Sequence, residues 1–102
     1  MKPRNWTSTG FAAGAWLPLV TETAALKTVI ICNTTASAQK VSLRITWGPE
    51  EVRSLIVNEE SVEAGKSVVL DLILLNLSRS DQLQIKLGDA GLSVTASGDL
   101  LP

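Results

Sequence analysis

The chain has 102 residues, of which 45% are hydrophobic and 19% are charged. A chain of this length forms one domain, and its apolar content excludes disorder throughout, which requires few apolar residues and a high net charge. Nine Lys and Arg against ten Asp and Glu leave a formal net charge of -1, so no overall field attracts nucleic acid or an anionic membrane.

Histidine is missing and cysteine occurs once, at Cys32. Without histidine the chain lacks the usual general base and the commonest metal ligand. A single cysteine forms neither an intramolecular disulfide nor a cysteine-based metal cage. We therefore expect no catalytic residue, no cofactor and no bound metal, and we expect that the protein is not an enzyme.

Residues 1–20 contain three of the four aromatic side chains. Trp6, Phe11 and Trp16 are spaced five apart among small residues, which fits neither one face of a strand nor a helical stripe. Two interpretations stay open. The segment is either the first strand and lid of the core, or an arm that buries these three aromatics on a neighbouring subunit, since interface cores are enriched in Trp and Phe.

From residue 15 onward, the sequence predicts short strands separated by turns. Pro18 interrupts the first strand and suits an edge or a bulge. In chain order the expected strands are residues 15–23, 26–32, 41–47, 53–58, 68–75, 82–87 and 92–97.

The strand expected at 41–47 alternates strictly, with Val41, Leu43, Ile45 and Trp47 on one face. This period of two predicts a half-buried strand with Trp47 on its buried side. The runs at 26–32 and 68–75 are apolar on both faces, so we expect the core to cover one face and another chain or segment to cover the other.

Apolar and polar residues also alternate at 82–87 and at 92–97, on either side of the short loop Gly88-Asp89-Ala90-Gly91. Glycine takes positive φ without steric cost, which suits a tight turn. Residues 81–97 are therefore predicted to form a β-hairpin.

About seven short strands and no amphipathic helix for crossovers predict an all-β protein. We expect an antiparallel β-sandwich, Ig-like or jelly-roll-like, with an irregular N-terminal arm. Residues 1–20 form the arm or first strand of this arrangement, and residues 21–102 form the sandwich domain.

Two motifs with possible chemistry have simpler structural explanations. Gly65-Lys66-Ser67 resembles the end of a phosphate-binding loop, but Glu60 occupies the position where that motif requires a glycine, so a turn before a strand is preferred. Glutamates around the fourth strand lack the spacing of a calcium loop and predict a charged edge that discourages strand pairing. They are Glu50, Glu51, Glu59, Glu60 and Glu63.

A small sandwich has much surface for its volume, and this chain has few charges to cover it. We therefore expect it to form a homo-oligomer, for which a trimer is one option, or to join a larger assembly.

Two strand-and-turn patterns cover roughly residues 26–98. In the first half, Leu26-Lys27-Thr28-Val29-Ile30-Ile31-Cys32-Asn33-Thr34-Thr35 precedes Val41-Ser42-Leu43-Arg44-Ile45. In the second half, Val62-Glu63-Ala64-Gly65-Lys66-Ser67 and Val69-Leu70-Asp71-Leu72 precede Asp81-Gln82-Leu83-Gln84-Ile85 and Leu92-Ser93-Val94-Thr95-Ala96-Ser97-Gly98. Together these patterns resemble small virion proteins of tailed bacteriophages.

That resemblance implies an Ig-like sandwich with a structural role on a phage particle. The first expectation is a capsid decoration (cement) protein that bridges subunits of the head, with other copies of itself and the major capsid protein as partners. It would be assembled into the virion in the bacterial cytoplasm. A neck, tail or fibre accessory protein of the same particle, or a carbohydrate- or receptor-binding module, is the alternative.

Overall fold

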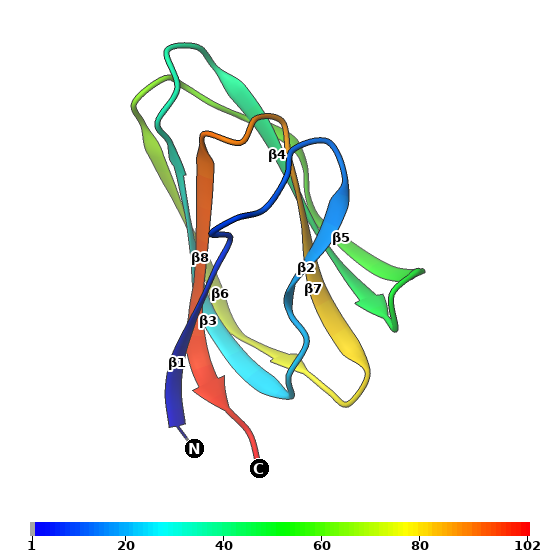
Figure 1. The fold of residues 1–102 in the computed structure, drawn as a ribbon. Helices are drawn as coiled ribbons and strands as arrows, with labels where there is room; N and C mark the ends of the chain where they lie inside the picture. The colour runs from blue at the N-terminus through cyan, green and yellow to red at the C-terminus, as the bar shows by residue number, and fades with distance from the viewer. Residues whose placement is uncertain (1) are drawn as a thin grey trace.

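The structure, a computed structural model, describes residues 2–102, without the side chains of residues 73 and 74. Regular structure over these residues is entirely β-strand (Figure 1). No described segment forms a helix of the length and apolarity that crossing a membrane requires. The strands are β1 (Lys2–Thr7), β2 (Trp16–Val20), β3 (Ala24–Asn33), β4 (Gln39–Trp47), β5 (Glu51–Val62), β6 (Ser67–Leu77), β7 (Asp81–Leu87) and β8 (Leu92–Leu100).

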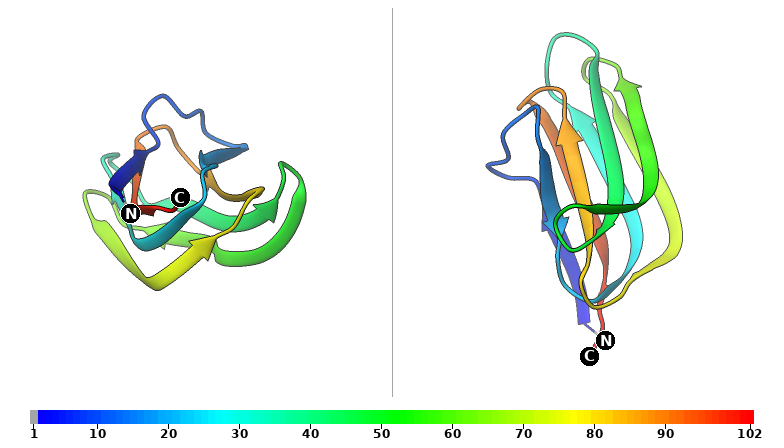
Figure 2. Two further views of the ribbon diagram at one scale, coloured as in Figure 1. Left: turned by 90° about the horizontal axis from the view of Figure 1, so that it is seen from below. Right: turned by 90° about the vertical axis from the view of Figure 1, so that its right-hand side faces the viewer.

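The strands form two four-stranded antiparallel sheets that pack face to face, as the end-on view in Figure 2 shows. Sheet A has the order β1-β8-β3-β6, and sheet B has the order β2-β7-β4-β5. The first strand thus pairs with the last, β2 with β7, β3 with β6, and β4 with β5. This nested pairing of eight strands is the jelly-roll arrangement, so the predicted all-β sandwich is confirmed in its jelly-roll form.

The core lies between the sheets and is built from the inward-facing residues of both. On β4, Val41, Leu43 and Ile45 are buried, as their alternation predicts. On β3 the pairing register shifts between Leu26 and Thr28, and this bulge lets Leu26 and Val29, three residues apart, both point inward.

The N-terminal segment begins with an ordered strand. Residues 2–7 form β1, which pairs with β8 over its whole length, and only residues 8–15 are irregular. Ser8 extends the pairing, because its backbone N–H donates to the Val94 carbonyl and its Oγ accepts from the Val94 N–H, each at 2.9 Å. Residues 2–7 therefore form the first strand of the sandwich, and the count of strands is eight rather than seven.

The predicted hairpin at residues 81–97 is wrong, although both of its strands are present. β7 belongs to sheet B and β8 to sheet A, so residues 88–91 cross from one sheet to the other. Leu87 and Leu92 are both buried and enter the core from opposite sheets. Gly88 lies against β4, the neighbouring strand of sheet B, because its backbone N–H donates a hydrogen bond of 2.7 Å to the Lys40 carbonyl oxygen.

The turn at Gly65-Lys66-Ser67 also joins strands of different sheets, β5 and β6. Gly65 has φ of 70°, which a glycine adopts without strain. The glutamates expected on a charged edge do lie on and beside β5, which is an edge strand of sheet B.

Candidate functional site

The three aromatic residues of the N-terminal segment lie in different environments. Trp6 is 7% exposed and belongs to the core, and Phe11 packs against the core from the loop that follows β1. In this structure the protein's own chain covers Trp6, so its indole has little surface left for a neighbouring subunit. Trp16 is half-buried outside that core, at the start of the edge strand β2.

Trp16 begins a row of side chains across the outer face of sheet B. It pairs in register with Lys86 on β7, and Lys86 pairs in register with Ser42 on β4. Neighbouring strands of a sheet lie about 4.8 Å apart, so the row places an indole, an ammonium and a hydroxyl side by side.

The row ends at a bulge in β5. The pairing of β4 with β5 jumps from Glu60 to Val57, which leaves Asn58 and Glu59 opposite the single residue Ser42. The Ser42 Oγ accepts a hydrogen bond of 2.8 Å from the Glu59 backbone N–H. Glu59 has φ of 49°, a left-handed conformation that costs an L-residue other than glycine about 1–2 kcal/mol. Bulges and strained residues of this kind are enriched beside functional sites.

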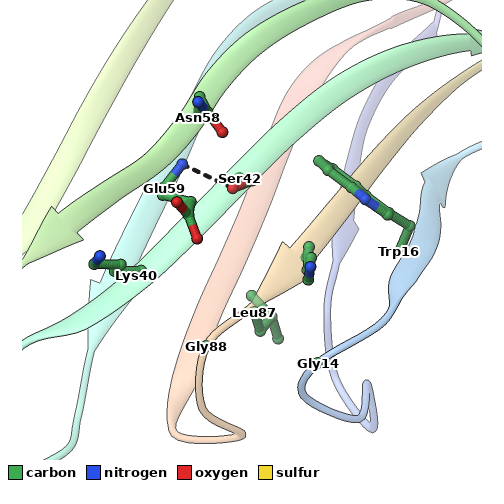
Figure 3. Close-up of a pocket in the computed structure, with 9 residues that line it drawn as sticks. Gly14, Trp16, Lys40, Ser42, Asn58, Glu59, Leu87 and Gly88 are labelled. Carbon is green, nitrogen blue, oxygen red and sulfur yellow. Dashed lines mark hydrogen bonds between the residues drawn. The ribbon is translucent and has the colours of Figure 1, made fainter.

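These residues line a groove on the outer face of sheet B (Figure 3). Trp16 stands at one side and points across the sheet toward Ser42, while Asn58 and Glu59 stand at the other side. The groove encloses about 530 Å³, part of it open to solvent. It is lined by Gly14, Trp16, Lys40, Ser42, Asn58, Glu59, Lys86, Leu87 and Gly88.

The groove carries a small excess of positive charge, from Lys40 and Lys86 against Glu59. Both lysines are exposed, and neither takes part in an ion pair with a described residue. Their ammonium groups are therefore free to meet an anion.

A polar network fixes the side of Trp16 that faces away from the groove. The Arg44 guanidinium carbon lies 4.2 Å from the centre of the Trp16 ring, a cation–π contact. Arg44 Nε donates to Gln84 Oε1 at 2.9 Å, and Gln84 Nε2 in turn donates to the Pro49 carbonyl and to Gln82 Oε1, each at 3.0 Å. Gln84 is buried, so this network holds Arg44, and through it the indole, in one place.

A second feature of the surface is a set of exposed apolar side chains. Val69 on β6 is 63% exposed and lies in register beside Ile30 of β3, which is 44% exposed, on the outer face of sheet A. Near the β4–β5 hairpin, Trp47 is 49% exposed, and Val52 and Leu55 are exposed to a similar degree. The prediction that Trp47 is buried is therefore wrong. It is the last residue of β4, beyond the end of the inward-facing row, where its ring meets Arg53 at 5.9 Å.

Of the residues that line the groove, the sequence indicated only Trp16 as an interface residue, and it assigned Glu59 to a charged strand edge. Ser42 and Lys86 were visible as the polar alternates of two predicted strands, but nothing local shows that these strands are neighbours. Asn58 and Glu59 come together with Ser42 only because β5 bulges at that point.

No cluster of three or more metal-ligating side chains occurs among residues 2–102 as described. No protein-family model matches the chain, and neither the curated proteins nor the solved structures give a match.

Proposed function

We propose that this protein is a non-enzymatic structural component of a tailed-bacteriophage virion, most simply a decoration (cement) protein that stabilises the head by bridging its subunits. Its partners are other copies of itself and the major capsid protein, and it acts in the virion after assembly in the host cytoplasm. The observation that carries the proposal is the outer surface of sheet A at β3 and β6, where apolar side chains and an open strand edge coincide.

Three of the four edge strands have features that discourage pairing with another chain. β1 has Pro3 between Lys2 and Arg4, β2 has Pro18, and β5 has three register shifts and several carboxylates. Charges, prolines and bulges of this kind protect sheet edges. The fourth edge, β6, has no proline, and Asp71 is the single charged residue in its sequence.

Apolar surface adjoins this open edge. Val69 and Ile30 project from the outer face of sheet A, whereas the half-buried Val68 and Leu70, which flank Val69 on β6, pack against the core. An exposed strand edge together with exposed apolar residues marks a site of association. Burying this face contributes about 25 cal/mol for each Å² of apolar surface, and many copies acting together make a modest contact sufficient.

Two further observations agree with a structural role on a particle. The jelly roll is an architecture that viral capsid domains use, and residues 26–98 resemble small virion proteins of tailed phages in their strands and turns. The chain also lacks histidine, the usual general base.

Position on the particle distinguishes the decoration protein from its nearest alternative, a neck, tail or fibre accessory protein. We would purify intact virions of a phage that encodes the chain and quantify the protein against the major capsid protein by mass spectrometry with labelled standard peptides. Hundreds of copies per particle are expected of a decoration protein, whereas a dozen or fewer would assign it to the neck or tail. Absence of the protein from purified particles would overturn the virion role.

A carbohydrate- or receptor-binding module is the second candidate. The groove with Trp16 on one side and polar side chains on the other is the observation that favours it. An exposed aromatic face in a shallow polar groove suits the binding of a sugar.

A further inference from the structure

The groove on sheet B presents one face of an indole ring to solvent-accessible space. Arg44 lies in register with Gln84, and Gln84 lies in register with Pro18, so the Arg44 guanidinium contacts the Trp16 ring from this row of the sheet. The groove lies on the other side of Trp16, toward Gly14 and Gly88. The guanidinium and the groove thus lie on opposite sides of the ring. An indole face held in this way is a platform for the C–H face of a sugar ring, which stacks on aromatic surfaces.

Apart from Leu87 and two glycines, the other residues that line the groove are polar and differ in charge. Lys40 and Lys86 are cations without an ion-pair partner among the described residues, while Asn58 and Glu59 offer hydrogen-bonding groups at the opposite side. Two ammonium groups against one carboxylate favour a ligand with a single negative charge. The hydroxyl-binding groups and the indole favour a sugar rather than a simple anion.

Contacts within the protein hold both sides of the groove in place. Ser42 fixes the Glu59 bulge by a hydrogen bond, and the Arg44–Gln84 network fixes the indole, so both sides keep their spacing without a ligand. Preorganisation of this kind reduces the entropic cost of binding. Glu59 keeps a strained backbone conformation at the rim of the groove, and its side chain is exposed there.

We propose that this groove binds a carboxylate-bearing sugar unit of an acidic polysaccharide. Trp16 stacks on the sugar ring, Lys40 and Lys86 bind its carboxylate, and Asn58 and Glu59 hydrogen-bond its hydroxyls. This inference is independent of the proposed virion role, because the groove lies on sheet B and the open apolar edge lies on sheet A.

The test uses the isolated full chain and two-dimensional NMR spectra of 15N-labelled protein. Trigalacturonate serves as the probe and is added up to about 10 mM, which detects dissociation constants in the millimolar range. The neutral galactose trimer with the same linkage, and sodium acetate at the same carboxylate concentration, are titrated in parallel. The indole N–H signal of Trp16 is identified by its loss in Trp16→Phe.

Trigalacturonate is expected to shift the Trp16 indole signal and the amide signals of Ser42, Glu59 and Gly88, and acetate and the neutral trimer are expected to leave them nearly unchanged. Lys40→Gln and Lys86→Gln each weaken binding about tenfold, as loss of one charge-assisted contact predicts. Lys66→Gln is the matched control, since Lys66 is exposed away from the groove, and it should bind as the parent does. Well-dispersed spectra of each variant show that it is folded.

Four results would overturn the proposal: no shift of the groove signals, equal shifts with the neutral trimer, equal shifts with acetate, or the same affinity in all three lysine variants. Because the probe meets the purified protein alone, none of these results bears on the presence of the chain in virions. Conversely, a chain missing from virions that still binds trigalacturonate through Trp16 and Lys86 would keep the groove and lose the assembly role.

Discussion

The indole Nε1–H of Trp6 donates a hydrogen bond of 2.9 Å to Oε1 of Glu22. The contact joins β1, an edge strand of sheet A, to the connection that leads from β2 in sheet B to β3 in sheet A. The other oxygen of Glu22 accepts from Arg4 Nη1 at 3.2 Å, but the two side chains are 48% and 39% exposed, so water screens this ion pair and it adds little. Among the side-chain contacts of β1, burial of the Trp6 ring in the core therefore contributes more than this ion pair, in addition to the pairing of β1 with β8.

Trp6→Ala is expected to lower the free energy of unfolding by about 3–5 kcal/mol, the usual cost of removing a large buried aromatic side chain. Trp6→Phe keeps most of the apolar contact and loses the hydrogen bond to Glu22, so it should cost less. Urea unfolding followed by circular dichroism measures both values.

Trp47→Ala is the matched control for Trp6, because the Trp47 ring is half exposed and lies outside the core. Its loss should change stability far less. If Trp6→Ala were as mild as Trp47→Ala, residues 2–7 would be a detachable arm rather than a strand of the sandwich.

Asn33 is a buried polar residue that ties three segments together at one end of the sandwich. Its Nδ2 donates to the Ser37 and Val62 carbonyls at 2.9 and 2.8 Å, and its Oδ1 accepts from the Thr35 N–H at 2.8 Å and from Thr35 Oγ1 at 2.7 Å. Asn33→Asp turns the two donated contacts into repulsion between a carboxylate and two carbonyl oxygens. We expect a loss of about 3 kcal/mol or more at neutral pH, above the 1–3 kcal/mol of an ordinary unsatisfied group.

Asn76→Asp is the corresponding control, since Asn76 is exposed on β6. The two variants introduce the same charge, and Asn76→Asp should stay within about 0.5 kcal/mol of the parent. Thermal unfolding of both at one pH separates the cost of the buried site from the cost of the charge. Equal stability of the two variants would show that the Asn33 network contributes nothing.

Local alternation in the sequence was enough to predict most of the strands. Residues 41–45, 83–87 and 92–96 alternate between apolar and polar side chains, and in each strand the apolar set faces the core. Pairing was not predictable in the same way. The four residues 88–91 suit a hairpin or a crossing between sheets equally well, and the choice depends on whether Leu87 and Leu92 fill the core from one side or from both.

The groove was hidden from the sequence for the same reason. Trp16, Lys86, Ser42 and Glu59 come from four strands, and the pairing order of sheet B, with the bulge in β5, brings them into one row. The outward direction of Ser42 and Lys86 follows from alternation, whereas their proximity follows only from topology. Trp47 shows a second limit of the sequence-based prediction. It continues the apolar alternation of β4 but is exposed, because alternation does not indicate where along a strand the core ends.

Gly98 on β8 is expected to tolerate no side chain. A Cβ at this position would meet the backbone of β3 at the Ala25 carbonyl oxygen and at Leu26 Cα, the latter at 2.9 Å. Backbone atoms in the middle of a sheet cannot rotate away, so Gly98→Ala should lower stability by about 1–3 kcal/mol or more, as overpacking does. Ser97→Ala, one residue earlier on the same strand, is the control and should stay close to the parent in urea unfolding. A Gly98→Ala variant as stable as Ser97→Ala would contradict the close β3–β8 contact.

Val69→Lys tests whether the outer face of sheet A mediates association. Val69 is largely exposed, so the substitution should leave the fold intact, while a charge on the open edge of β6 opposes pairing with a second chain. Sedimentation velocity should show the parent as an oligomer at micromolar concentration and Val69→Lys shifted toward the monomer. Val52→Lys makes the same change on β5, an edge already protected by bulges and carboxylates, and should assemble as the parent does. If the parent is a monomer, or if the two variants disrupt assembly equally, β6 is not the interface. Only a contact that is specific to β6 would make Val69→Lys more disruptive than Val52→Lys, since both substitutions place a lysine on an exposed strand edge.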